Sequence, residues 1–274
     1  MSFVLAALDA SSRSRTVLDT AVRVGRLTDT AVRAVHVRSD PGAPYDVVES
    51  LAEEAGVELR VVDGTPAPAL VDAIREPETI AAVIGGCARS VLADPRAWQV
   101  ARALLEQTNT PVVVVPSGIE RSGEIHRLLV PLEGAELSSR PVLEQLVPLV
   151  VADVELEVLH VFTAATVPAM LDQPTYALDT LGREFLSRHF PRAGTIEFRT
   201  GAVVEQVAQV SIDHDIDLIV LSWSQSPSPE RALVVRGVLE GSSRPVLLLP
   251  VAPSGNSSSN GPIAVDDAVA PVRR

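Results

Sequence analysis

Two consecutive glycines, Gly85 and Gly86, end an apolar run in the segment AAVIGGCARS. Where a buried strand ends in glycine, the missing Cβ lets backbone N–H groups approach a phosphate closely. A tight turn after a buried strand uses the same residue type, so two interpretations are open: a nucleotide site or a structural turn. Arg89 lies in the same segment, and its guanidinium is a nearby cation that could meet an anion.

Acidic residues end two other apolar runs: Asp9 follows FVLAAL, and Glu133 follows RLLVPL. A carboxylate at the carboxyl end of a strand can contact a ligand, or it can instead cap the next helix. We therefore count Asp9 and Glu133 as candidate ligand contacts. Val37, at the end of the apolar run AVHV, completes the candidate set with Gly85 and Gly86.

Histidine and cysteine are common catalytic and metal-binding residues, but in this sequence few suitable side chains lie near them. His36 and His160 follow apolar strand residues without other ligands at metal spacing, which favours buried or capping histidines. Cys87 has Arg89 nearby, and one arginine is weak support for a reactive thiol. No Ser-His-Asp order, carboxylate pair or phosphate-loop lysine stands out, so we predict no catalytic residue, no metal and no enzyme activity.

The composition narrows the range of partners. The 274 residues include 23 Lys and Arg against 35 Asp and Glu, for a net charge of −12. This charge disfavours nucleic acid and anionic membranes, because no basic run offsets it. The single cysteine excludes a disulfide within the chain, and neither a signal peptide nor an apolar run of about 20 residues is seen. We therefore expect a cytoplasmic protein with no nucleic-acid or membrane partner.

The candidate residues belong to an internal repeat. Three pairs of segments resemble each other in order: FVLAALDAS with RLLVPLEGA, AVHV with VLHV, and TPVVVVP with RPVLLLP. Asp9 precedes His36 by the same spacing by which Glu133 precedes His160. We therefore expect the same structure twice.

Each copy alternates apolar strands with helices, which predicts a parallel sheet with right-handed crossovers. In the first copy we expect strands at 3–8, 31–37, 57–62, 79–84 and 111–116, and helices at 16–27, 46–55, 67–75 and 97–107. In the second copy we expect strands near 127–132, 154–161, 195–199, 217–222 and 245–250. Hydroxyl side chains just before the first helix are expected to cap it; they are Ser11, Ser12 and Ser14.

The repeat gives a division into domains. We predict a first domain at 1–117, a polar linker at 118–126 and a second domain at 127–251. Residues 252–274 are rich in Ser, Gly, Pro and Asn, and we expect them to form a disordered tail.

The ordered motifs resemble tandem universal stress protein domains. They are the strand-end acid, HV after the second strand, glycine after the third, the fourth strand ending at glycine, and a final PVVVV or PVLLL. The resemblance implies two α/β domains, each a doubly wound, five-stranded parallel sheet of order 3-2-1-4-5 flanked by helices. It also implies a ligand at the carboxyl ends of strands one and four, where the strand order reverses.

The resemblance also implies how the copies associate. Last strands pair between subunits in this family, so we expect the strands at 111–116 and 245–250 to pair within the chain as a pseudo-dimer. Each of these strands is expected to end at a proline, Pro116 or Pro250. Proline has no backbone N–H to donate to a neighbouring strand, so it is favoured at the end of a strand. A homodimer and an unidentified protein partner are further expectations.

The ATP-binding members of this family carry Gly-x2-Gly-x9-Gly-Ser/Thr after strand four. When this pattern is aligned with the first copy so that it starts at Gly85, its other three positions fall on Ala88, Trp98 and Gln99. The second copy has no motif glycine, and its four positions are Ser222, Gln225, Ala232 and Leu233. Gly85 and Gly86 are thus interpreted as the inherited turn of a nucleotide site.

Three functions are compatible with these observations. The favoured one is a stress-response module that acts in regulation or interaction and has lost the family's ATP binding. No cofactor is expected for it beyond weak binding of ATP. The alternative is an ATP or AMP sensor with a divergent site in the first copy, where Asp9 holds the base. The third is an enzyme of a related doubly wound superfamily, which would need catalytic residues that the sequence does not display.

Overall fold

The computed structural model describes residues 1–40, 42–86, 95–117, 123–132, 145–146, 153–163, 180, 182–183, 186, 195–223 and 229–250. The first copy contains nine elements in chain order: β1 (Phe3–Leu8), α1 (Ser14–Thr28), β2 (Ala31–Arg38), α2 (Asp46–Ala55), β3 (Glu58–Asp63), α3 (Pro66–Ile74), β4 (Thr79–Gly85), α4 (Pro95–Gln107) and β5 (Val112–Val115). The second copy contributes β6 (Arg127–Leu132), β7 (Glu155–Phe162), β8 (Thr195–Thr200), α7 (Val203–Asp213), β9 (Leu218–Trp223), α8 (Pro229–Gly241) and β10 (Val246–Pro250).

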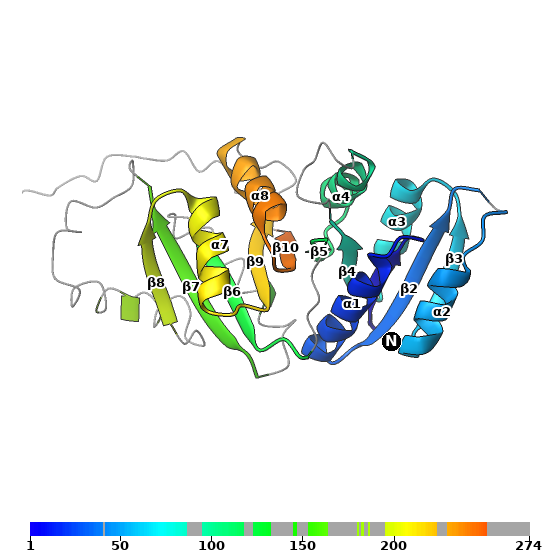
Figure 1. Ribbon diagram of the computed structural model, residues 1–274, viewed down its shortest axis with the longest axis horizontal. Coiled ribbons are helices and arrows are strands. Elements are labelled where there is room, and N and C mark those ends of the chain that lie inside the picture. Colours follow the sequence, from blue (N-terminus) through cyan, green and yellow to red (C-terminus); the bar gives the residue numbers. More distant parts are fainter. Residues whose placement is uncertain are drawn as a thin grey trace, which may run out of the picture.

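The strands form one ten-stranded sheet of order β3-β2-β1-β4-β5-β10-β9-β6-β7-β8. Each half has the order 3-2-1-4-5 and purely parallel pairing, as the sequence predicts. Figure 1 shows the halves side by side, with β5 and β10 meeting between them. The predicted α/β fold class is therefore confirmed.

The two halves join through one antiparallel strand pair. Val246, Leu247 and Leu248 of β10 face Val114, Val113 and Val112 of β5. All four residues of β5 are buried, which fits a continuous apolar strand with neighbours on both sides. The edge of each half that would otherwise be open is therefore covered inside the chain.

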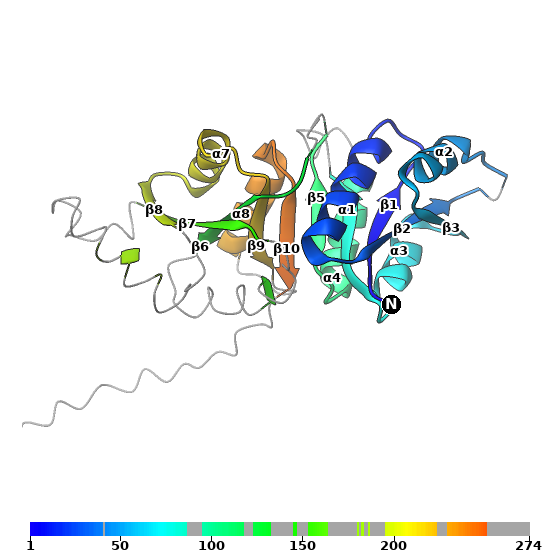
Figure 2. The same ribbon diagram turned by 90° about the horizontal axis from the view of Figure 1, so that it is seen from below.

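Helices cover both faces of the sheet. Figure 2 shows α1 and α2 on one side of the first half and α3 and α4 on the other. Buried residues of α3, α4, α7 and α8 belong to one apolar cluster, which continues from the first half into the second. Among the described residues, no helix combines the length and the apolar character that crossing a membrane requires.

Helix α1 approaches β2 so closely that it needs a glycine. A Cβ placed on Gly25 would lie 2.8 Å from Cγ2 of Val32 and 2.9 Å from the carbonyl oxygen of Thr30. The second of these atoms belongs to the backbone and cannot rotate away. Gly25 therefore sets the distance between this helix and the sheet.

A buried ion pair also connects the copies. The guanidinium of Arg23 on α1 lies 3.2 Å from Oδ1 of Asp217, which immediately precedes β9, and the side chains are 5% and 13% exposed. Arg23 also donates to the carbonyl oxygens of Gly123 and Glu124, before β6. Asp217 in turn accepts from the backbone N–H groups of His126 and Arg127. One arginine thus holds the first copy, the chain segment before β6 and the second copy together.

Candidate functional site

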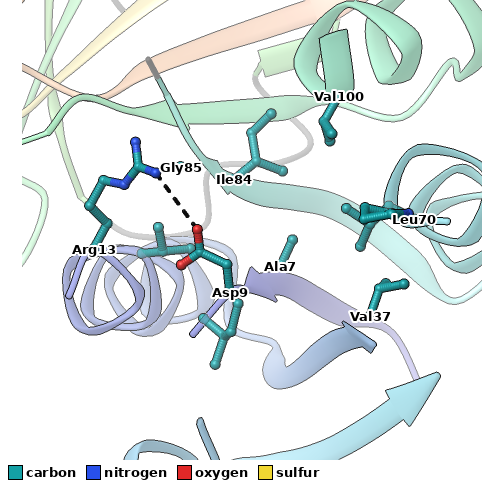
Figure 3. Close-up of a pocket in the computed structure, with 11 residues that line it drawn as sticks. Ala7, Asp9, Arg13, Val37, Leu70, Ile84, Gly85 and Val100 are labelled. Carbon is teal, nitrogen blue, oxygen red and sulfur yellow. Dashed lines mark ion pairs between the residues drawn. The ribbon is translucent and has the colours of Figure 1, made fainter. Parts of the chain in front are cut away.

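A pocket of about 370 Å³ opens at the carboxyl ends of β1, β2 and β4, where the strand order reverses. Its lining comes from the strands and from α1, α3 and α4: Ala7, Leu8, Asp9, Arg13, Val17, Val37, Pro66, Leu70, Ile84, Gly85 and Val100. The structure thus brings together three of the predicted site residues, Asp9, Val37 and Gly85. Figure 3 shows the charged pair at one end of this first-copy pocket and Leu70, Val37 and Val100 at the other.

Asp9 is held by the turn that precedes α1. Its Oδ1 accepts from the backbone N–H of Ser11 at 3.0 Å and from the Ser11 hydroxyl at 2.5 Å, and it lies 3.0 Å from Ser14 Oγ. Its Oδ2 lies 3.8 Å from Nη2 of Arg13. Burial raises the pKa of the Asp9 carboxyl, but the hydrogen bonds from Ser11 and Ser14 and the charge of Arg13 outweigh it and lower this pKa.

The same turn corrects the expected helix cap. Helix α1 begins at Ser14, and Arg13 occupies the cap position without a side-chain hydrogen bond to the helix. Ser11 directs its hydroxyl to the carboxylate of Asp9, and Ser14 directs its hydroxyl to the backbone carbonyl and the carboxylate of Asp9, so neither hydroxyl caps the helix. The prediction that Ser11, Ser12 and Ser14 cap this helix is therefore wrong.

Arg13 was missed in the sequence. Its Nη1 lies 3.5 Å from the carbonyl oxygen of Gly86, and its Nε lies 3.5 Å from Ser11 Oγ. It follows Asp9 at the i, i+4 spacing that brings side chains together on a helical turn. An Asp followed four residues later by Arg at the expected start of the helix was the signal that could have identified it.

The two glycines have different environments. Gly85 lines the pocket, and a Cβ there would meet only Val17 at an ordinary 3.6 Å. Gly86 donates its N–H to the carbonyl oxygen of Val115 at 2.7 Å, and a Cβ on it would lie 2.8 Å from Val114 Cγ1. Gly86 is thus required by close packing against β5, and its N–H is already used.

The beginning of α3, on the far side of the pocket, is poor in donors. The helix begins at Pro66, and its N-cap residue Thr65 makes no side-chain cap hydrogen bond. Pro68 follows two residues later, so two of the first three helical positions have no N–H. A helix start of this kind offers an anion less than the usual set of backbone donors.

The second copy differs at the corresponding place. Gly85 pairs with Val115 on β5, and Ser222 pairs with Leu249 on β10, so Ser222 takes the place of Gly85. Trp223 then takes the place of Gly86. Its indole N–H donates to the carbonyl oxygen of Leu105, near the end of α4 in the first copy, at 3.1 Å. The second copy thus uses this position to contact the first.

The histidines have matching structural positions. Nδ1 of His36 lies 2.9 Å from the carbonyl oxygen of Leu8, and the ring is buried. His160 has the corresponding backbone hydrogen bond with Leu132, and burial lowers its pKa more than this bond raises it. Each histidine therefore joins the second strand of its copy to the end of the first. Among the described residues, no cluster of three metal-ligating side chains is found.

Several predicted residues lie outside the described residues. They are Arg89 and Glu133 of the candidate site, together with Cys87, Ala88 and the motif position Gln225. The side chains of Trp98 and Gln99 and the tail at 252–274 are also outside them.

Three solved structures resemble this chain over most of its length and of their own. A protein of unknown function from Pseudomonas aeruginosa PAO1 is 13% identical, with a TM-score of 0.65 over 90% of this chain and 92% of that one. A chain from Pseudomonas aeruginosa UCBPP-PA14, assigned to the universal stress proteins, is 12% identical, with a TM-score of 0.63 over 90% and 92%. A universal stress protein from Archaeoglobus fulgidus DSM 4304 is 14% identical, with a TM-score of 0.55 over 90% and 95%.

No protein-family model and no curated protein matches the chain. The structural likenesses confirm, for the fold, the resemblance that the motifs predicted.

Proposed function

The chain has the tandem universal stress protein fold, and from this premise we propose that it is a regulatory or interaction module in stress response that has lost the family's ATP binding. The observation that carries the proposal is the hydrogen bond from Gly86 to Val115. A phosphate loop presents backbone N–H groups after this strand, and here the first N–H beyond β4 is donated to β5.

The electrostatics of the pocket support the same conclusion. Asp9 and Arg13 are the charged side chains in the described lining, and their charges cancel. A triphosphate needs an excess of positive charge or of N–H donors, and the prolines at the start of α3 reduce the donors. The sequence adds Ala88 at a position where the ATP-binding pattern has glycine.

A titration with Mg²⁺ and ATP tests the proposal. We expect no binding in isothermal titration at micromolar concentrations, and equally weak signals for ATP, AMP and adenosine, because the phosphates have no site. Micromolar affinity for ATP that falls from ATP to AMP to adenosine would contradict the proposal, since it would demonstrate a working phosphate site.

The second candidate function is a nucleotide sensor with a divergent site in the first copy. Its support is the pocket itself, which unites Asp9, Val37 and Gly85 at the strand ends. If a nucleotide binds there with Asp9 on the base, Asp9→Ala abolishes its binding. Asp19→Ala, which removes an exposed carboxylate from α1 itself, is the matched control. An affinity that is equal in the two variants rejects this site.

A further inference from the structure

The end of α7, in the second copy, holds a histidine between two carboxylates. Nδ1 of His214 lies 2.5 Å from Oε2 of Glu157 on β7, and Nε2 lies 3.6 Å from Oε2 of Glu197 on β8. We propose that these three residues, the histidine cluster, form a pH-sensitive switch: protonation of His214 adds a hydrogen bond to Glu197 and holds the end of α7 more tightly on the sheet. The switch is independent of the first-copy pocket and of nucleotide binding there.

The bond to β7 determines which ring nitrogen carries the proton. An ionised carboxylate only accepts hydrogen bonds, so Nδ1 of His214 donates to Glu157. In the neutral ring Nε2 then has a lone pair and no hydrogen. The neutral ring therefore has no donor for Glu197, although the two side chains are 3.6 Å apart.

The carboxylate on β8 lacks the donor that protonation supplies. Oε2 of Glu197 is buried and has no hydrogen-bond partner among the described residues, whereas Oε1 accepts from Nε of Arg199 at 2.5 Å. A buried carboxylate oxygen without a donor costs free energy. The imidazolium form of His214 has a second N–H that can provide this donor, and the neutral form does not.

The charges around the ring are negative in sum. The described residues place these charged side chains there: Glu157 from β7, Glu197 and Arg199 from β8, and Asp213 from α7. The guanidinium of Arg199 also lies 3.8 Å from Asp213, so it is shared between two carboxylates. Two neighbouring ion pairs are neutral in themselves: Arg127 with Glu155, and Arg244 with Asp215. A positive charge on the ring therefore reduces an excess of negative charge.

The first copy has permanent charges at the corresponding positions. The sheet register places Glu157 of β7 where β2 has Arg33. It places Glu197 of β8 where β3 has Arg60. Arg60 pairs with Glu76, just after α3, and neither of these side-chain types titrates near neutral pH. The second copy thus has the opposite sign at both strand positions, and its partner after the helix is a residue type whose charge changes near neutral pH.

Hydrogen exchange in the last turn of α7 tests the switch in the full chain, because the backbone N–H of His214 is bonded there to Val210. It is measured at about pH 8, 7 and 6, values that bracket the ordinary histidine pKa of about 6.5. His214→Gln retains a donor for Glu157 but cannot take up a charge. The protection of the wild type relative to this variant should be at least about threefold larger at the lowest pH than at the highest, since partly exposed charge pairs are weak.

Two further variants separate the switch from general effects of acidification. Glu197→Gln retains an acceptor for Arg199 but removes the negative charge opposite Nε2. Protection of the wild type relative to Glu197→Gln should therefore also increase as the pH falls. His126→Gln is the control, because His126 is exposed and hydrogen-bonds only through its backbone among the described residues. The ratio of wild type to this control should not change with pH.

The ratios decide the outcome at each carboxylate. A ratio of wild type to His214→Gln that stays constant with pH overturns the switch. A constant ratio of wild type to Glu197→Gln also overturns it, because the second carboxylate would then not receive the hydrogen bond. An equal increase relative to His126→Gln overturns it as well, since the effect would not be specific to the histidine cluster.

Discussion

Asp9 stabilises the turn before α1 only while its carboxyl group is ionised. Each of its partners, Ser11, Ser14 and Arg13, favours the charged form. Burial opposes them by raising the pKa, but their sum lowers the folded-state pKa beneath the ordinary value of 3.8. The contribution to stability is therefore fully present above the unfolded-state pKa, and it is lost as the pH falls through the folded-state pKa.

We predict that Asp9→Asn lowers the free energy of unfolding at pH 7 by at most about 1 kcal/mol, because the side chain is 60% exposed and solvent screens its charge. The difference from the wild type should shrink as the pH falls below 3.8. Urea unfolding at pH 7, 5 and 3 (values that bracket the Asp pKa of about 3.9) measures this. Asp19→Asn controls for the loss of a negative charge. A difference that stays constant with pH would contradict the ionised role of Asp9.

Among the elements, the contact between α1 and β2 depends on the absence of one methyl group. Gly25→Ala gains helix propensity of up to about 1 kcal/mol, but its Cβ meets the side chain of Val32 and the backbone oxygen of Thr30. Overpacking costs about 1–3 kcal/mol, so after the propensity gain we predict a net loss of up to about 2 kcal/mol.

Chemical unfolding of Gly25→Ala and of Gly241→Ala makes the comparison. A Cβ on Gly241 would lie 3.9 Å from Val204, which is ordinary contact, so this variant should be neutral or slightly more stable. Equal stability of the two variants would show that the helix moves away from the sheet without cost.

The elements were largely predictable because their signals are local. The runs FVLAAL and RLLVPL are bounded by polar residues, and they became β1 and β6 with the expected bounds. The start of α1 was not predictable from cap propensity, because the Ser14 hydroxyl bonds to Asp9, which lies outside the helix. Nor could the sequence indicate that Trp223 binds the carbonyl of Leu105, since the two residues are 118 positions apart.

The candidate site was predictable only in part, because strand ends can be located from local sequence but the positions of helices cannot. Asp9, Val37 and Gly85 could be placed together because each ends a strand, and strand ends of a parallel sheet meet at one edge. Arg13 lies in the turn before α1, and Leu70 and Val100 lie on helices, whose rotation about their axes depends on packing. The commitment of Gly86 to β5 depends on the exact approach of a neighbouring strand.

The pairing of β5 with β10 affects how this chain can associate with a second copy. The strand that the family uses between subunits is already paired inside this chain. The expected homodimer would therefore have to use another surface, and it stays a prediction. Among the described strands the outermost are β3 and β8, and Glu58, Arg60 and Asp63 place exposed charge along β3. Charged side chains of this kind disfavour edge-to-edge pairing.

The ion pair of Arg23 and Asp217 links the two copies through buried side chains. These residues are 194 positions apart, and neither the repeat nor local spacing indicates their contact. Both side chains are nearly excluded from water, so removal of one partner leaves the other charge buried. We predict that Arg23→Leu lowers the free energy of unfolding by about 3 kcal/mol or more.

Arg33→Leu is the matched control, because Arg33 pairs with the exposed Glu58 at the sheet surface, and such pairs contribute about 1 kcal/mol or less. The double variant Arg23→Leu with Asp217→Leu should recover much of the loss, since it removes both buried charges together. A double-mutant cycle from urea unfolding measures the coupling energy between the two positions. Additive single effects would mean that Arg23 acts through the carbonyl oxygens of Gly123 and Glu124 instead, and the second copy would then be joined to the first mainly by its strand pair and by Trp223.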